Sequence, residues 1–226
     1  MPEIEGAGVA LHYSERGEGR GLLVIHGTTP RLGASALDEL AAAGARAVAY
    51  DRRGYGASGA PEPYVATTVQ EQSEDAAAVL ESLALAPALL VGDGFGALIA
   101  LELLVRRPEL ANAAVLGEPP LFAYVPAATE VLAAERQALE EALREGGPEA
   151  AVGPDHKGYL ADYSGVASWS PSRRELRGVG VPVAVVTGPQ SAPHVVAAAD
   201  AGAALLPEVR RTHDGDLVAA ARALLA

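Results

Sequence analysis

Short apolar segments alternate with helical segments along most of this chain, and this alternation constrains the fold more than any other feature. The apolar runs predict strands at residues 8–13, 21–26, 46–51, 88–91, 113–116, 181–187 and 207–211. Composition and helical spacing predict helices at 35–43, 69–85, 126–145, 193–203 and 215–225. A further helix is predicted from the glycine-rich turn after the strand at 88–91 to about residue 107. Because strands joined by crossover helices pair in parallel, we expect a three-layer α/β fold with a mostly parallel central sheet.

The alternation stops near residue 120 and resumes near residue 181. Between them lie the predicted helix at 126–145 and a stretch at 146–177 that is predicted to be irregular and that holds the only tryptophan. We therefore interpret residues 121–177 as a short helical lid over the edge of the sheet. Residues 1–120 and 178–226 are interpreted as one core, since 226 residues support a single sizeable core.

The charge balance argues against two classes of partner. The chain has 29 acidic and 17 basic residues and a formal charge of −12. Such a surface repels phosphate backbones and anionic lipids, so we expect no nucleic-acid partner and no membrane partner. No apolar run reaches the roughly 18 residues of a membrane span, and the first residues show no signal pattern, so we expect a cytoplasmic protein. The oligomeric state cannot be read from the sequence.

Glycine-rich turns follow two of the predicted strands. His26-Gly27-Thr28-Thr29 follows the second strand, and Gly92-Asp93-Gly94-Phe95-Gly96 lies between the strand at 88–91 and a helix. The loop Asp51-Arg52-Arg53-Gly54-Tyr55-Gly56-Ala57-Ser58 lies between them, and its glycines permit backbone shapes closed to other residues. With His213 before the final helix, these segments resemble the α/β-hydrolase superfamily over nearly the whole chain.

The resemblance implies an α/β-hydrolase fold and a set of site residues. The nucleophile elbow of that family, G-x-S-x-G, aligns with the second glycine turn and puts Gly94 at the nucleophile position. Thr28 and Phe95 then correspond to the residues whose N–H groups form the oxyanion hole, and His213 corresponds to the catalytic histidine. Because glycine carries no reacting oxygen, the nucleophile position of this chain is vacant.

The acid of the site is less clearly marked. In the family it usually follows the next-to-last strand, but residues 187–191 contain no carboxylate. A known variation places it after the preceding strand, where Glu118 stands, and a carboxylate there would orient His213 and stabilise its protonated form. A solvated glutamate at the end of a strand is an equal alternative. The remaining candidates for substrate contact, whose aromatic members fit core packing equally well, are His26, Asp93, Phe122 and Trp169.

Three functions follow from the vacant position. The chain is a hydrolase of a small ester or related acyl compound whose serine has been replaced by Gly94, a hydrolase in which His213 activates a water, or a small-ligand-binding pseudoenzyme without catalysis. In each case we expect a small-molecule substrate or ligand that is uncharged or weakly polar. No metal or organic cofactor is implied, since no histidine–carboxylate cluster has ligand spacing.

A fourth interpretation comes from the same glycines. Gly92, Gly94 and Ala97 also satisfy the dinucleotide fingerprint G-x-G-x-x-G/A, and Glu118 follows where an acid that binds ribose belongs. That motif normally opens the first strand–helix–strand unit of a sheet, whereas here other units precede it. The dinucleotide interpretation also leaves the His-Gly turn, the 51–58 loop and His213 unexplained.

Overall fold

The computed structural model describes residues 2–29, 31–166 and 169–226. They form an eight-stranded sheet in the order β1-β2-β4-β3-β5-β6-β7-β8. The strands are β1 Glu3–Glu5, β2 Ala10–Arg16, β3 Arg20–Ile25, β4 Ala45–Tyr50, β5 Ala88–Asp93, β6 Ala111–Gly117, β7 Val183–Val186 and β8 Val209–Thr212. From β3 to β8 neighbouring strands pair in parallel, and β1 and β2 add an antiparallel edge. The mostly parallel sheet predicted from the alternation is confirmed.

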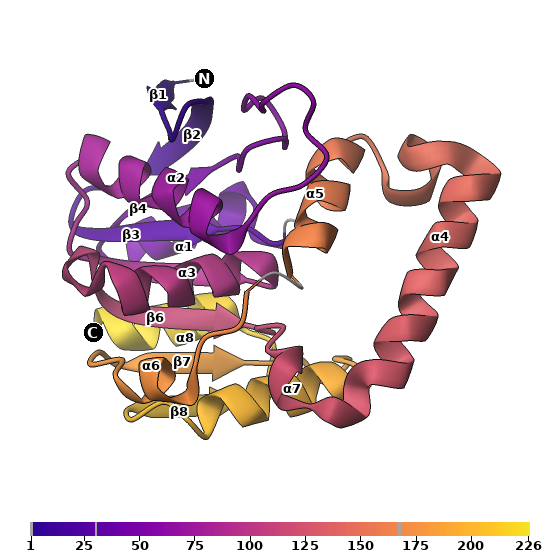
Figure 1. The fold of residues 1–226 in the computed structure, drawn as a ribbon. Coiled ribbons are helices and arrows are strands. Elements are labelled where there is room, and N and C mark those ends of the chain that lie inside the picture. Colours follow the sequence, from indigo (N-terminus) through magenta and orange to yellow (C-terminus); the bar gives the residue numbers. More distant parts are fainter. Residues whose placement is uncertain (1, 30, 167–168) are drawn as a thin grey trace.

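Helices cover both faces of this sheet, as Figure 1 shows. The leucines of α1 (Ala34–Ala42) and α8 (Leu217–Leu225) pack on one face. The opposite face is covered by α2 (Val69–Ser82), α3 (Phe95–Arg106) and α7 (Pro193–Ala203). Central strands buried on both faces read as continuous apolar runs, which is why the sequence revealed them. Within the described ranges no helix is both long enough and apolar enough to cross a membrane.

The segment between β6 and β7, hereafter the insertion, is largely helical. Its elements are η2 Phe122–Tyr124, η3 Pro126–Ala128, α4 Thr129–Val152, α5 His156–Val166 and α6 Arg173–Arg177. The expectation of irregular structure over 146–177 is therefore wrong for most of its described part. Gly147 adopts a φ of 75°, so α4 kinks there, and Pro148 follows within the same helix. A proline after such a kink starts a helical segment without losing a needed hydrogen bond. In Figure 1 the arrowhead of β6 points toward the insertion, and α4 forms the outer edge of the molecule.

Candidate active site

The junction between β5 and α3 places Gly94 at the carboxyl edge of the sheet. β5 ends at Asp93 and is wholly buried, and α3 begins at Phe95, so Gly94 alone joins them. Its φ and ψ are 52° and −116°, a region that residues with side chains rarely adopt. A Cβ at Gly94 would meet only the Cα of Gly27, at 3.8 Å. The position therefore has room for a side chain, but its backbone conformation favours glycine.

The turn at residues 26–28 packs directly against Gly94. A Cβ on Gly27 would lie 2.9 Å from the carbonyl oxygen of Asp93, so only glycine permits this approach. Phe95 is the first residue of α3, and its N–H has no acceptor within the helix. Among the described residues, neither the N–H of Phe95 nor that of Thr28 donates a hydrogen bond to an acceptor. Two unpaired backbone donors thus belong to residues that adjoin Gly94 and Gly27.

A cavity of about 820 Å³ adjoins these two turns. Thr28, Gly94 and Phe95 line it on the side of the core, and the insertion supplies most of the remaining wall. The wall contains both phenylalanines of the chain, its only tryptophan and three of its seven tyrosines: Phe95, Phe122, Trp169, Tyr124, Tyr159 and Tyr163. A concave site with mostly apolar walls and few polar groups is typical of small-molecule binding.

The predicted site residues divide into two groups. The structure brings together Gly94, Thr28, Phe95, Phe122 and Trp169 in the lining of the cavity. Within the described part of the chain, the residues that line it do not include His26, Asp93, Glu118 or His213. Trp169 also attaches the insertion to the core, because its Nε1 donates to Glu102 Oε2 of α3 at 2.7 Å.

His213 faces a hydroxyl group instead of a carboxylate. Its Nδ1 lies 3.0 Å from Thr187 Oγ1, and Arg211 Nη2 donates to the same oxygen at 2.8 Å. Within the described part of the chain, the side-chain contact of His213 is thus with a hydroxyl, and the carboxylate partner of a catalytic triad is not in place.

Glu118 and Asp93 meet at Arg31 and not at His213. Arg31 Nη1 donates to Glu118 Oε1 at 3.1 Å, and Arg31 Nε donates to Asp93 Oδ2 at 2.6 Å. Ser191 Oγ donates to the same Glu118 oxygen at 2.7 Å. Burial raises the pKa of Asp93, and the hydrogen bond from Arg31 opposes that shift. The contacts of the described residues thus do not include the hydrogen bond expected between Glu118 and His213.

His26 is held by the backbone and lies outside the lining of the cavity. Its Nδ1 lies 2.6 Å from the carbonyl oxygen of Gly27, and its Nε2 accepts the N–H of Arg52 at 3.0 Å. Because Nε2 accepts a hydrogen bond, the proton of the neutral ring belongs on Nδ1. Burial, together with the charge of Arg52, lowers the pKa of His26 from 6.5 to about 3. The ring therefore stays neutral in the folded protein at ordinary pH.

We expect acidification from about pH 7.5 to about pH 4.5 to remove roughly 3 kcal/mol of stability through His26. Below its ordinary pKa of 6.5 the unfolded chain binds a proton at His26, whereas the folded chain does so only near pH 3. The free energy of unfolding therefore decreases as the pH is lowered from 6.5 to about 3. Urea unfolding at both pH values measures the loss. His26→Gln serves as the control, and an equal loss in both proteins would contradict the prediction.

No local pattern in the sequence indicates the buried charged network that lies behind the 26–28 turn. Arg52 Nε donates to the carbonyl oxygen of His26 at 2.8 Å, and Arg52 Nη2 donates to that of Gly27 at 3.1 Å. Its guanidinium also pairs with Asp162 of α5, and both side chains are fully buried. The motif of the 51–58 loop indicates only that its glycines permit unusual backbone shapes, and nothing local to it indicates a partner that lies 110 residues away.

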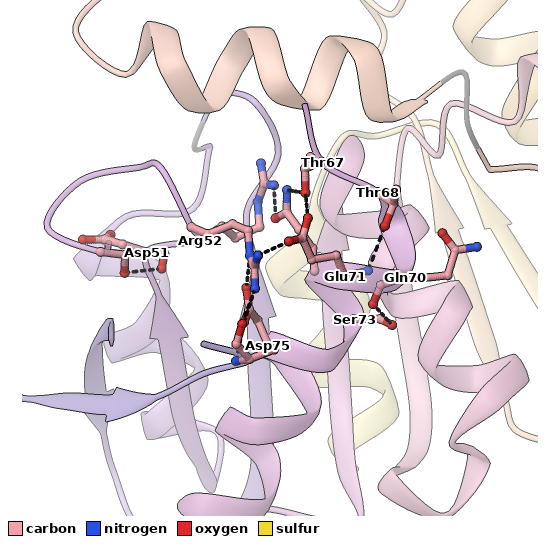
Figure 2. A network of polar contacts seen from close by, with 12 residues as sticks. Asp51, Arg52, Thr67, Thr68, Gln70, Glu71, Ser73 and Asp75 are labelled. Carbon is pink, nitrogen blue, oxygen red and sulfur yellow. Dashed lines mark hydrogen bonds and ion pairs between the residues drawn. The ribbon is translucent and has the colours of Figure 1, made fainter. Parts of the chain in front are cut away.

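The adjacent Arg53 forms a second buried pair, with α2. Its Nε and Nη2 donate to Asp75 at 2.6 and 2.8 Å, and its Nη1 donates to Glu71. Figure 2 shows Asp75 and Glu71 on the side of α2 that faces this loop. Thr68 Oγ1 accepts the N–H of Glu71 at 3.0 Å. This second pair ties the loop to the core, and none of its residues lines the described wall of the cavity.

Comparisons with known proteins agree with this architecture. A family model described as serine aminopeptidase, S33, matches residues 20–161. An epoxide hydrolase of Caballeronia sordidicola is 35% identical over 109 residues, which are 47% of this chain and 33% of that protein. The 2-hydroxymuconate semialdehyde hydrolase of Pseudomonas sp. (strain CF600) is 29% identical over 185 residues, 71% of this chain and 65% of that protein. The chain thus spans less than two thirds of the length of either relative.

Structural similarity extends over nearly the whole chain. A thermophilic esterase from Thermogutta terrifontis superimposes with a TM-score of 0.73 at 18% sequence identity. The superposition covers 94% of this chain and 89% of the esterase. At this level of identity the likeness concerns the fold alone.

Proposed function

The chain belongs to the serine aminopeptidase S33 family of α/β hydrolases, and on that premise we propose that it binds small apolar molecules bearing a carbonyl or carboxylate group. In this proposal the cavity is a hydrolase site without the covalent step. Gly94 is the observation that carries it. Gly94 lines the cavity in a backbone conformation that would be strained for a residue with a side chain, as at an elbow nucleophile. The position has space for a side chain, yet glycine offers no reacting atom.

The polar end of the proposed ligand follows from the unpaired backbone donors. The N–H groups of Thr28 and Phe95 have no acceptor among the described residues, and both residues line the cavity. Phe95 also opens α3, where the helix dipole favours negative charge. Such a pair of donors suits a carboxylate or the oxygen of a polarised carbonyl group.

The apolar end follows from the distribution of aromatic residues. Aromatic side chains make up only 4% of the chain, yet most of them line this one cavity. Among the described lining residues, the charged ones are Glu135 and Arg136 of α4, and both have partners: Glu135 contacts His194 at 3.3 Å, and Arg136 Nε donates to Glu140 at 2.9 Å. The wall therefore suits a neutral ring next to the polar head of the ligand.

The contacts of His213 weigh against hydrolysis by an activated water. That route needs a general base within reach of the water, and a carboxylate that stabilises the base once it is protonated. His213 has Thr187 and Arg211 as neighbours instead, and it does not belong to the described lining of the cavity. We therefore place ligand binding ahead of turnover.

Phenylacetate is expected to change the fluorescence of Trp169 saturably, with a dissociation constant of about 1 mM or tighter. Trp169 is the only tryptophan and lies in the cavity wall, so its emission reports occupancy directly. Titration of the unmodified chain measures the constant. Phenethylamine, which carries the opposite charge on the same ring, should bind at least about tenfold more weakly because the site offers donors to the head group.

Two variants and an ester assay complete this test. Tyr163→Ala removes one aromatic group of the wall and should weaken phenylacetate, whereas Val65→Ala, at an exposed position outside the wall, should not. The unmodified chain should not hydrolyse 4-nitrophenyl butyrate above the buffer rate. Absence of saturable binding would refute the proposal, as would ester turnover that disappears in His213→Ala.

A further inference from the structure

One face of α5 consists of small residues and a single carboxylate. Gly158, Ala161, Asp162 and Gly165 recur at helical spacing and are all buried. A Cβ on Gly158 would lie 2.6 Å from the ring of Tyr55, so glycine lets the helix approach the 51–58 loop closely. Small residues alone leave the rotation of a packed helix weakly defined, whereas a buried charge must meet its partner.

Asp162 is completely enclosed by donors from the core. It accepts from Arg52 Nη1 at 3.0 Å and also from Arg52 Nη2, from the Tyr55 hydroxyl at 2.6 Å and from Gln72 Nε2 at 2.8 Å. The side chains of Asp162 and Arg52 are both 0% exposed. Burial opposes the charge on Arg52, but Asp162 outweighs it and holds the pKa of Arg52 above its usual range.

The same guanidinium reaches both turns of the candidate site. Arg52 donates to the carbonyl oxygens of His26 and Gly27, the two residues that precede Thr28. Its Cζ also lies 5.1 Å from the centre of the Phe95 ring. Arg52 therefore contacts the backbone next to Thr28, which carries one of the unpaired N–H donors. It also contacts the side chain of Phe95, which carries the other.

Other residues of α5 form the wall of the cavity. Tyr159, Tyr163, Ser164 and Val166 line it, while Asp162 lies on the buried face toward the core. A rotation or shift of α5 would thus move the aromatic wall relative to Thr28 and Gly94.

We infer that Arg52 and Asp162 are a positioning pair, which sets the rotation of α5 and holds the 26–28 turn so that the aromatic wall and the backbone donors face one cavity. The importance of this pair for ligand binding rests on the proposed function, whereas its role in positioning α5 and the 26–28 turn does not. Replacing a buried ion pair with apolar residues of similar volume is often neutral or stabilising, so stability alone is a weak reason for this pair. The Arg52–Asp162 pair is better explained by a role in fixing one arrangement of α5 relative to the 26–28 turn.

Asp162→Asn tests this inference, with Asp75→Asn as the matched control. Both carboxylates are fully buried, and their partners are the adjacent arginines Arg52 and Arg53. Only Asp162 belongs to the insertion, through α5. At equal folded fraction, we expect Asp162→Asn to raise the dissociation constant of phenylacetate by about fivefold or more. Asp75→Asn should leave it within about twofold, the usual scatter of such contributions. Equal weakening by the two variants would overturn the inference.

Amide hydrogen exchange provides a readout that needs no ligand. Exchange in residues 156–166 should become about tenfold faster or more in Asp162→Asn, because a broken buried pair lowers the free energy of local opening. In Asp75→Asn the faster exchange should be confined to α2 and the residues it contacts. Unchanged exchange of α5 in Asp162→Asn would refute the positioning role. If phenylacetate fails to bind the unmodified chain, the proposed function fails, and hydrogen exchange still decides this inference.

A milder variant covers the case in which Asp162→Asn does not fold. Tyr55→Phe removes the hydroxyl that donates to Asp162 at 2.6 Å and keeps both charges. It should speed exchange in residues 156–166 and weaken phenylacetate in the same direction, by about two- to fivefold. If Tyr55→Phe alters neither quantity while the protein is folded, the positioning role is wrong.

Discussion

The double variant Gly94→Ser/Thr187→Asp is expected to hydrolyse 4-nitrophenyl butyrate about a thousandfold above the buffer rate, which the unmodified chain should not exceed, since it carries both groups that the proposed site lacks for a hydrolytic triad. The serine enters a position whose added Cβ would have its nearest contact at 3.8 Å. The aspartate replaces a hydroxyl that now lies 3.0 Å from His213 Nδ1. Steady-state hydrolysis, followed by release of nitrophenolate, measures the gain.

The single variants separate the two restored groups. Gly94→Ser alone should react slowly with a fluorophosphonate, because His213 still lacks a carboxylate partner among the described residues. Addition of Thr187→Asp should speed that labelling by about 10²–10⁴-fold, the usual contribution of general base catalysis, because the carboxylate orients His213 as the base. Should Gly94→Ser alone match the double variant, and lose its rate in Glu118→Gln, then Glu118 acts as the acid. An inert but folded double variant would refute the interpretation of Gly94 as a vacated nucleophile position.

The three glycines of the same turn should respond very differently to alanine. At Gly96 a Cβ would lie 2.0 Å from the carbonyl oxygen of Ile25, and at Gly92 it would lie 2.4 Å from that of Gly96. These contacts are with backbone and cannot relax cheaply, so each variant should lose more than about 4 kcal/mol. Gly94→Ala meets no such contact and should lose only about 1–3 kcal/mol, through its positive φ of 52°.

Urea unfolding followed by the emission of Trp169 measures these losses, because that residue is the only tryptophan. Val65→Ala, at an exposed position, serves as the reference for a substitution without structural effect. Equal stability of Gly92→Ala and Gly94→Ala would show that the turn is not as tightly packed as the structure indicates.

Local patterns predicted the core of the fold well. The strands at 21–26, 46–51 and 88–91 correspond to β3, β4 and β5 to within a few residues, because strands buried on both faces are continuous apolar runs. The insertion was predicted less well. Its helices α5 and α6 contain glycine, tyrosine and arginine without a clear apolar stripe, and α5 packs through glycine and alanine, which an amphipathic pattern does not detect.

The candidate site was also predicted unevenly. Thr28, Gly94 and Phe95 do line one cavity, because each lies at or just beyond the end of a parallel strand, and such ends meet at one edge of a sheet. The partners of the charged residues were not predictable in this way. Glu118 was expected to face His213, but Arg31 and Ser191 take its oxygen, and Thr187 meets the histidine.

The sequence by itself determined the layered fold and the fact that residue 94, in the turn after the strand at 88–91, is a glycine. The alternation of neighbouring strands and helices fixes the class of sheet. A glycine has no reacting oxygen wherever it lies in the fold. Only the tertiary structure decided which charge meets which. Arg52 and Asp162 are 110 residues apart, and their pairing follows from how α5 crosses the core, a long-range arrangement that no local spacing encodes. The shape of the cavity depends on that arrangement.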